Sequence, residues 1–144
     1  MGEKGCTILI ADDEPEVVDL VRIVLETEGY TVIAAADGEQ ALAQARAHKP
    51  GLILLDIRMP KMSGLTVLNY FRRDPALTAI PVIMLSVVTT YPEIRSALEQ
   101  GAIAYISKPF ELREMVRLID RVLAMNAAGR ENLRQHALSD IGKR

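Results

Sequence analysis

The sequence predicts an α/β protein: a five-stranded parallel sheet that is doubly wound, with helices on both faces. Segments with strand-like apolar runs alternate five times with segments that have helical spacing. Parallel strands require such helical crossovers, and right-handed crossovers place helices on both sides of a sheet. Residues 52–55 are four consecutive aliphatic side chains, which is typical of a central strand buried on both faces.

The composition is that of one ordinary domain. The chain has 144 residues, 49% hydrophobic and 25% charged, with one cysteine and two histidines. It therefore offers no internal disulfide framework and no zinc ligand set. A net charge of −2 lacks the basic balance of nucleic-acid binders, so we expect no direct nucleic-acid binding by this chain. Without a signal-peptide pattern or an apolar run of membrane-spanning length, we expect a cytoplasmic protein with no membrane segment.

In the first half of the chain, each expected strand ends in a turn and a helix follows. Pro15 suits the first turn of a helix, because its missing N–H would be unpaired there, and Gly29 stops that helix. The second helix starts at Asp37-Gly38 and ends near His48. The expected strands of this half span residues 6–11, 31–35 and 52–56.

The second half repeats the pattern, and we assign residues 1–126 to a single domain. A third helix follows Gly64, a fourth runs from Pro92 to Gly101, and a fifth has an apolar face from Leu112 to Leu123. The expected strands span residues 81–85, where a first-residue proline is tolerated, and 103–106.

Residues 127–144 form a C-terminal tail. The spacing of Leu133, Ala137, Leu138 and Ile141 permits a short amphipathic helix. Chain ends are often loose, so a frayed terminus is one interpretation. A linker toward a further domain, or a helix that docks, is the other, and the sequence leaves both open.

Asp56 follows the buried run and has two interpretations. Ligands of open α/β sheets bind outside the carboxyl ends of the strands, so an acid there is well placed for chemistry. Alternatively, Asp56 is a helix-capping residue after a strand. The decision depends on the other strand ends, which supply Asp12, Asp13, Ser86 and Lys108 to the same edge if the sheet is parallel.

Together these side chains indicate an acid that is phosphorylated beside Mg²⁺. Three neighbouring carboxylates repel one another and favour a shared cation. Oxygen ligands suit Mg²⁺, which readily takes a phosphate oxygen as a further ligand. Lys108 could hold a phosphate as a point charge, and Ser86 could donate a hydrogen bond to it. A carboxylate can itself be the nucleophile and form an aspartyl phosphate.

Four motifs occur in order along the chain. They are Asp12-Asp13 after a strand, Leu55-Asp56-Ile57-Arg58-Met59-Pro60 with Gly64, Leu85-Ser86, and Tyr105-Ile106-Ser107-Lys108-Pro109-Phe110. The set resembles the receiver domain of two-component response regulators, chemotaxis regulators included, over roughly residues 6–125. The resemblance implies the flavodoxin-like strand order 2-1-3-4-5 and a cis Lys108–Pro109 bond.

The resemblance also implies a role for each residue at the edge. Asp56 would accept a phosphoryl group from a phosphohistidine on a sensor histidine kinase or phosphotransfer protein. Asp13 and Asp56 would ligate Mg²⁺ directly, the backbone carbonyl of Arg58 would complete the protein ligands, and Asp12 would often act through water. Lys108 would pair with the phosphoryl oxygens.

Ser86 and Tyr105 would form the switch. Ser86 would turn toward the phosphoryl group and Tyr105 would turn inward, which repacks the surface made by the fourth helix, the last strand and the fifth helix. That surface would bind an output partner, which the sequence does not identify, or a second copy of the chain in a homodimer. Such a protein is not an enzyme beyond its own phosphotransfer and slow autodephosphorylation. Considered alone, Tyr105 is nearly as typical of an ordinary half-buried strand tyrosine as of a switch residue.

Two residues depart from the family pattern. Val87 stands where the family usually has a small residue, and we expect it to narrow access to the phosphoryl site. Arg58 could contact the phosphoryl group or screen it from water. We expect both residues to change the lifetime of the phosphorylated state without abolishing it.

Two other classes of function compete with this one. A receiver-like protein-binding module could work without phosphorylation, although the full acidic set with Lys108 argues against it. A flavodoxin-like cofactor binder or a small phosphohydrolase is further away. Only Tyr91 is available for flavin stacking, and no spare acid is present for turnover.

Overall fold

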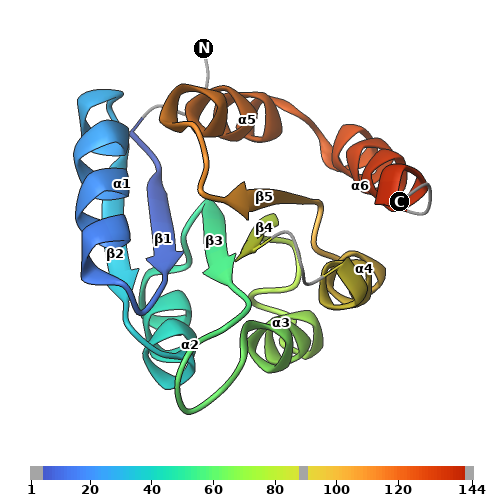
Figure 1. The fold of residues 1–144 in the computed structure, drawn as a ribbon, viewed down its shortest axis with the longest axis horizontal. Coiled ribbons are helices and arrows are strands. Elements are labelled where there is room, and N and C mark those ends of the chain that lie inside the picture. The colour runs from blue at the N-terminus through green and yellow to red at the C-terminus, as the bar shows by residue number, and fades with distance from the viewer. Residues whose placement is uncertain (1–4, 88–90, 142–144) are drawn as a thin grey trace.

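The computed structural model describes residues 5–87 and 91–141. Residues 88–90, in the expected connection to the fourth helix, and 142–144, at the end of the expected tail, lie outside the described residues. Five parallel strands form one sheet in the order β2-β1-β3-β4-β5 (Figure 1), which confirms the predicted fold class and strand order. The strands are β1 (Thr7–Ala11), β2 (Thr31–Ala35), β3 (Leu52–Asp56), β4 (Val82–Val87) and β5 (Ala104–Lys108). The helices are α1 (Pro15–Thr27), α2 (Gly38–His48), α3 (Gly64–Arg73), α4 (Tyr91–Glu99), α5 (Leu112–Ala124) and α6 (Ala127–Ile141).

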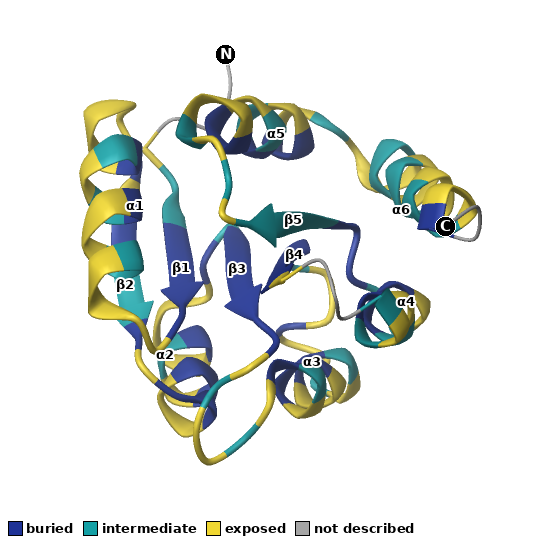
Figure 2. Cartoon of the chain, in the orientation of Figure 1, coloured by how far each residue is buried: buried dark blue, intermediate teal, exposed yellow. Residues whose placement is uncertain are grey.

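The sheet separates two layers of helices and two apolar clusters. Helices α1 and α5 cover one face, and α2, α3 and α4 cover the other. Because strand side chains alternate between faces, Leu52 and Leu54 of β3 pack toward α1 and α5, whereas Ile53 and Leu55 pack toward α2, α3 and α4. Figure 2 shows β3 buried along its length, as the run of aliphatic residues predicts.

The helix ends follow the local chemistry of the sequence. Pro15 is the first residue of α1, and Gly29 beyond its end has φ of 101°, a left-handed conformation that glycine adopts at little cost. The Asp37 side chain accepts a 2.8 Å hydrogen bond from the backbone N–H of Gln40 and so caps α2. This bond lowers the pKa of Asp37.

Strands β4 and β5 are longer at their carboxyl ends than the sequence indicates. The pairing continues through Ser86 opposite Ser107 and Val87 opposite Lys108. Ser86 and Lys108 therefore lie within the paired ends of these strands, one or two residues beyond the strand limits that the sequence indicates. The ladder limits the freedom of both backbones and leaves only their side chains to adjust.

Residues 127–141 of the expected tail are helical, and α6 packs against α4 and β5. Ile141 is 5% exposed within the cluster that α2, α3 and α4 share. Whether residues 127–144 link the domain to another one stays a prediction. Across residues 5–87 and 91–141, no helix has the length and apolar character needed to cross a bilayer.

Candidate functional site

The carboxyl edge of the sheet brings the expected polar residues together. Asp12 follows β1 directly, Asp56 is the last residue of β3, Ser86 is the next-to-last of β4, and Lys108 is the last of β5. Asp13, Asp56, Ser86 and Lys108 line one open hollow at this edge. Adjacent parallel strands thus deliver residues that are far apart in sequence to one place.

Asp12, Asp13 and Asp56 form an acidic cluster. One carboxylate oxygen from each lies within 4.8 Å of the others. Asp12 is 1% and Asp56 5% exposed, whereas Asp13 is exposed. Burial raises the pKa of Asp56 to about 6, the charge of Asp12 adds to the rise, and the Lys108 ammonium opposes it. A cation at the cluster would offset the negative charge that disfavours ionisation of Asp56.

Lys108 is the positive counterpart of this cluster. Its Nζ lies 3.0 Å from Asp56 Oδ2, 2.9 Å from Glu14 Oε1 and 2.8 Å from Asp12 Oδ2. The contact with Asp12 Oδ2 is ionic, because this buried oxygen has no aligned hydrogen bond within the described residues. Burial lowers the pKa of Lys108, but its carboxylate partners outweigh burial, and the net pKa is raised. The amine is therefore a permanent cation at neutral pH.

The backbone holds Asp56 firmly at the end of β3. The Ile57 N–H donates to the Leu85 carbonyl (3.1 Å) and the Gly64 N–H to the Ile57 carbonyl (2.7 Å). A Cβ at Gly64 would overlap the backbone carbonyl oxygen of Asp56, so the close approach of α3 to β3 requires glycine there. The Arg58 N–H also donates to Asp56 Oδ1 at 3.2 Å.

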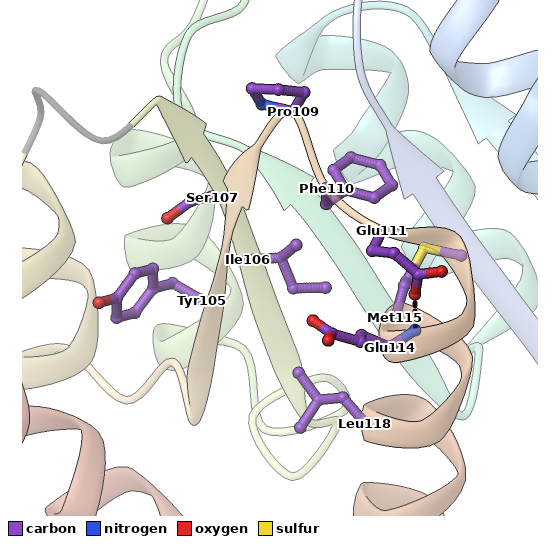
Figure 3. Close-up of a pocket in the computed structure, with 9 residues that line it drawn as sticks. All are labelled: Tyr105, Ile106, Ser107, Pro109, Phe110, Glu111, Glu114, Met115 and Leu118. Carbon is purple, nitrogen blue, oxygen red and sulfur yellow. Dashed lines mark hydrogen bonds between the residues drawn. The ribbon is translucent and has the colours of Figure 1, made fainter.

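Ser86 and Tyr105, the two expected switch residues, occupy different places. Ser86 is 3% exposed, lines the acidic hollow and donates from Oγ to the Val87 carbonyl at 3.2 Å. Tyr105 is half-buried against the cluster under α2, α3 and α4 and does not line that hollow. Tyr105 and Ile106 both line a second hollow, which the acidic cluster does not line, and Figure 3 shows their side chains leaving β5 in opposite directions, that of Ile106 toward α5. Their roles in a switch stay predictions.

Arg58 and Val87 stand at the mouth of the acidic hollow. Arg58 Nη2 lies 2.9 Å from Glu93 Oε1 in the first turn of α4, and Val87 is 41% exposed. The Arg58 guanidinium is thus engaged with α4, an arrangement that the sequence did not indicate. Glu93 and the Lys108 partner Glu14 are the two residues that sequence reasoning missed. The acidic run at residues 12–14 was a usable indication for Glu14, but nothing in the sequence pairs Glu93 with Arg58.

The donor set fits Mg²⁺. Within the part of the chain that the structure describes, Asp12, Asp13 and Asp56 are the cluster of three or more potential metal-ligating side chains. All three offer carboxylate oxygens, the ligands that Mg²⁺ prefers, and no sulfur or imidazole intrudes. A Mg²⁺ ion could bind near the Lys108 ammonium despite the repulsion between the two cations, because the cluster carries three carboxylates and Glu14 adds a fourth.

A parallel sheet in this order, with clustered aspartates and a lysine at its carboxyl edge, defines the receiver class of signalling domain. The chain belongs to the response regulator receiver domain family, whose model matches residues 8–120. Proteins of this family receive phosphoryl groups from histidine kinases, generally bind Mg²⁺ at such an aspartate cluster, and act as signalling proteins, not as conventional enzymes.

Individual relatives agree with this assignment. The chain is 40% identical to the DNA-binding dual master transcriptional regulator RpaA of Synechocystis over 116 residues, 81% of this chain and 48% of that protein. It is similar in structure to the chemotaxis response regulator CheY4 of Vibrio cholerae, with a TM-score of 0.78, 29% identity, and 83% and 99% of the two chains covered. The receiver domain of NtrX from Brucella abortus gives a TM-score of 0.77 and 31% identity over 83% and 99%. The chain spans about half the length of the curated relatives it matches.

The cis peptide bond at Lys108–Pro109 agrees with the expectation from the family resemblance.

Proposed function

We propose that the chain is a phosphorylation-activated signalling switch in which Asp56 accepts a phosphoryl group in a Mg²⁺-dependent step. The observation that carries this proposal is the position of Asp56: a buried carboxylate beside Asp12 and Asp13, with the Lys108 ammonium 3.0 Å from its Oδ2. This carboxylate is suited to act as a nucleophile toward phosphorus, because the neighbouring ammonium can stabilise the negative charge that phosphorylation adds.

The proposed step is an attack by an Asp56 carboxylate oxygen on the phosphorus of a phosphohistidine. The new O–P bond forms as the P–N bond breaks, and the electron pair of that bond goes to the imidazole of the donor. The donor would be a sensor histidine kinase or a phosphotransfer protein. Because burial raises the pKa of Asp56 to about 6, the ionised nucleophile predominates above that pH.

Residues around Asp56 would stabilise the charge that builds up on the phosphoryl oxygens. Lys108 would exchange part of its contact with the carboxylates for the phosphoryl oxygens, as a mobile point charge can. Ser86 would donate a hydrogen bond from the neighbouring strand. Mg²⁺ at the cluster would neutralise the carboxylate charge. Its protein ligands would be Asp13, Asp56 and the Arg58 carbonyl, and Asp12 would act through water. The phosphorylated protein would return slowly to its resting state by hydrolysis of its own acyl phosphate.

The output would be a change of binding surface around α4, β5 and α5, with Ser86 and Tyr105 as the moving side chains. A partner protein or a second copy of the chain would recognise that surface. We propose no direct contact with nucleic acid by this chain, whose net charge is −2.

The test is the intact mass of the protein after incubation with acetyl phosphate and Mg²⁺. We expect a gain of one phosphoryl group that is lost on treatment with hydroxylamine, which cleaves acyl phosphates but not serine phosphates. The gain should disappear in Asp56→Asn and when a chelator replaces Mg²⁺. Asp19→Asn, at an exposed position on α1, is the matched control and should behave like the parent protein. A phosphoryl group that resists hydroxylamine, or no gain at all, would instead favour a binding module that works without phosphorylation.

A further inference from the structure

Helix α6 covers the β5 edge of the sheet, although it lies outside the residues 8–120 that match the family. Only Met125 and Asn126 separate it from α5, and Figure 1 shows it turning back from α5 toward α4. Its Leu133 packs against the cluster under α1 and α5, whereas Ile141 belongs to the cluster under α2, α3 and α4. The helix therefore straddles the outer strand and contacts both layers.

Polar contacts attach α6 to the ends of two neighbouring helices. Arg134 Nη1 donates to the Leu98 carbonyl in the last turn of α4 at 2.7 Å, and Arg130 Nε donates to the Val122 carbonyl of α5 at 3.0 Å. The Leu98 carbonyl also accepts from the Gly101 N–H and the Val122 carbonyl from the Met125 N–H, so each arginine adds a second, charged donor at a helix C-terminus. Glu131 holds the Arg134 guanidinium in place through two hydrogen bonds of 2.9 and 2.7 Å.

The docking of α6 is nevertheless shallow. Ile141 is the one buried residue among its described positions, and Leu133, Ala137 and Leu138 are only partly covered. A helix of this length is marginal in water on its own, because ordering it costs conformational entropy that packing must offset. An element with so little burial can exist docked or released, and a small change in its binding face shifts the balance.

The acidic hollow is connected to that binding face through α4. The Arg58 backbone N–H bonds Asp56, and its guanidinium pairs with Glu93 at the start of α4. Leu98, at the end of the same helix, receives Arg134 of α6. A phosphoryl group on Asp56 adds negative charge beside Arg58 and competes with Glu93 for its guanidinium. Loss of the Arg58–Glu93 pair frees the first turn of α4 from the loop that follows β3.

We propose that α4 and β5 form a helix-binding face whose resident occupant is α6, and that a phosphoryl group at Asp56 weakens the docking of α6. The released face fits a helix of the α6 type: leucine, alanine and isoleucine at helical spacing, with an arginine that caps the last turn of α4. This inference rests on the proposed function of Asp56. It adds that the uncovering of this face, not only a change in its shape, is the output.

The test is amide hydrogen exchange of the unaltered protein, with and without beryllium fluoride and Mg²⁺, a tetrahedral substitute for the phosphoryl group. We expect exchange in residues 131–141 to accelerate about fivefold or more on loading, the lower end of usual coupling between sites, while β1 and β3 are unchanged. Failure to bind beryllium fluoride would overturn the proposed function and this inference together. Binding with α6 exchange unchanged or slowed would overturn only the coupling.

A variant tests the same coupling from the other side. Linkage is reciprocal, so loosening α6 with Ile141→Ala should lower the half-saturating concentration of beryllium fluoride, by at most the factor that loading adds to α6 exchange. Fluorine-19 NMR measures that concentration, and His136→Ala on the exposed side of α6 is the matched control. Amide exchange of residues 131–141 shows how far the variant releases α6, and a half-saturating concentration that does not fall in step with that release would refute the coupling. Because Ile141 lies in the last turn of α6, β1 and β3 should keep their exchange protection in the variant.

Discussion

Replacing Asp56 by asparagine should stabilise the Mg²⁺-free protein at neutral pH. The folded structure keeps this carboxylate 5% exposed, beside Asp12, and its pKa rises from 3.8 to about 6. A pKa raised on folding means that the folded state binds the proton more tightly, so ionisation of Asp56 opposes folding. The opposition is absent below about pH 4 and complete once the pH exceeds about 6.

The size of the effect follows from the shift. About two pKa units at ~1.4 kcal/mol each set an upper limit of roughly 3 kcal/mol. Asp56→Asn also weakens the contact with Lys108, and solvent at the open hollow screens the charges, so we expect a net gain of about 1–2 kcal/mol. For a chain of this size, that gain raises the melting temperature by about 2–8 °C.

Thermal and urea denaturation in the presence of a chelator measure this gain at pH 7.5 and pH 5. The advantage of Asp56→Asn should shrink at the lower pH, because the parent protein then regains its proton. Saturating Mg²⁺ should stabilise the parent protein more than the variant and narrow the difference. Asp19→Asn should show no such pattern. A variant that is no more stable than the parent at pH 7.5, or an advantage independent of pH, would refute the electrostatic argument.

Three further outcomes can be measured. Gly64→Ala should cost about 1–3 kcal/mol in urea denaturation, because its Cβ overlaps the Asp56 carbonyl oxygen and forces the backbone to move; an unchanged midpoint would contradict this close approach. Arg58→Ala and Val87→Ala should each speed hydrolysis of the phosphorylated protein by up to about tenfold, since both side chains stand at the mouth of the hollow, and unchanged rates in both would count against that role. The hydrogen-bonded Arg134 lowers the pKa of Glu131 from 4.5 to about 2. Any stability that Glu131→Gln loses should therefore be lost at pH 7, and the loss should vanish as the pH falls from 4.5 toward 2. A loss that persists at low pH would have another cause.

The sheet was predictable because its elements have strong local patterns. Residues 52–55 are aliphatic without interruption, as a strand buried on both faces requires, and Pro15 and Gly29 delimit α1. The parallel arrangement follows from the helical connections, and it alone implies that Asp12 and Asp56 share an edge. The strand order came from the family resemblance, since periodicity does not say which strands are neighbours.

The side-chain partners at the site were less accessible to sequence reasoning. Lys108 reaches Glu14 across 94 positions of sequence, and Arg58 reaches Glu93 across 35. Such pairs depend on rotamers and on how far β4 and β5 extend, and the sequence underestimated both strands. In the tail, the spacing of apolar residues permitted a helix. Its packing against α4 and β5 could not be predicted, because it depends on the direction in which the chain turns at residues 125–126.

The main-chain bonds around Asp56 fix the position of its carboxylate without help from the side chains at the rim of the hollow. Evolution can therefore change those side chains while the position of the carboxylate stays the same. Ile57 and Gly64 tie Asp56 to β4 and to the start of α3 through peptide groups, which substitution of the side chains at the rim of the hollow leaves in place. Arg58 also donates its backbone N–H to Asp56 Oδ1, whereas the side chains of Arg58 and Val87 stand at the rim of the hollow. Relatives built on this scaffold can therefore diverge in how quickly a signal decays while the chemistry that receives it stays the same.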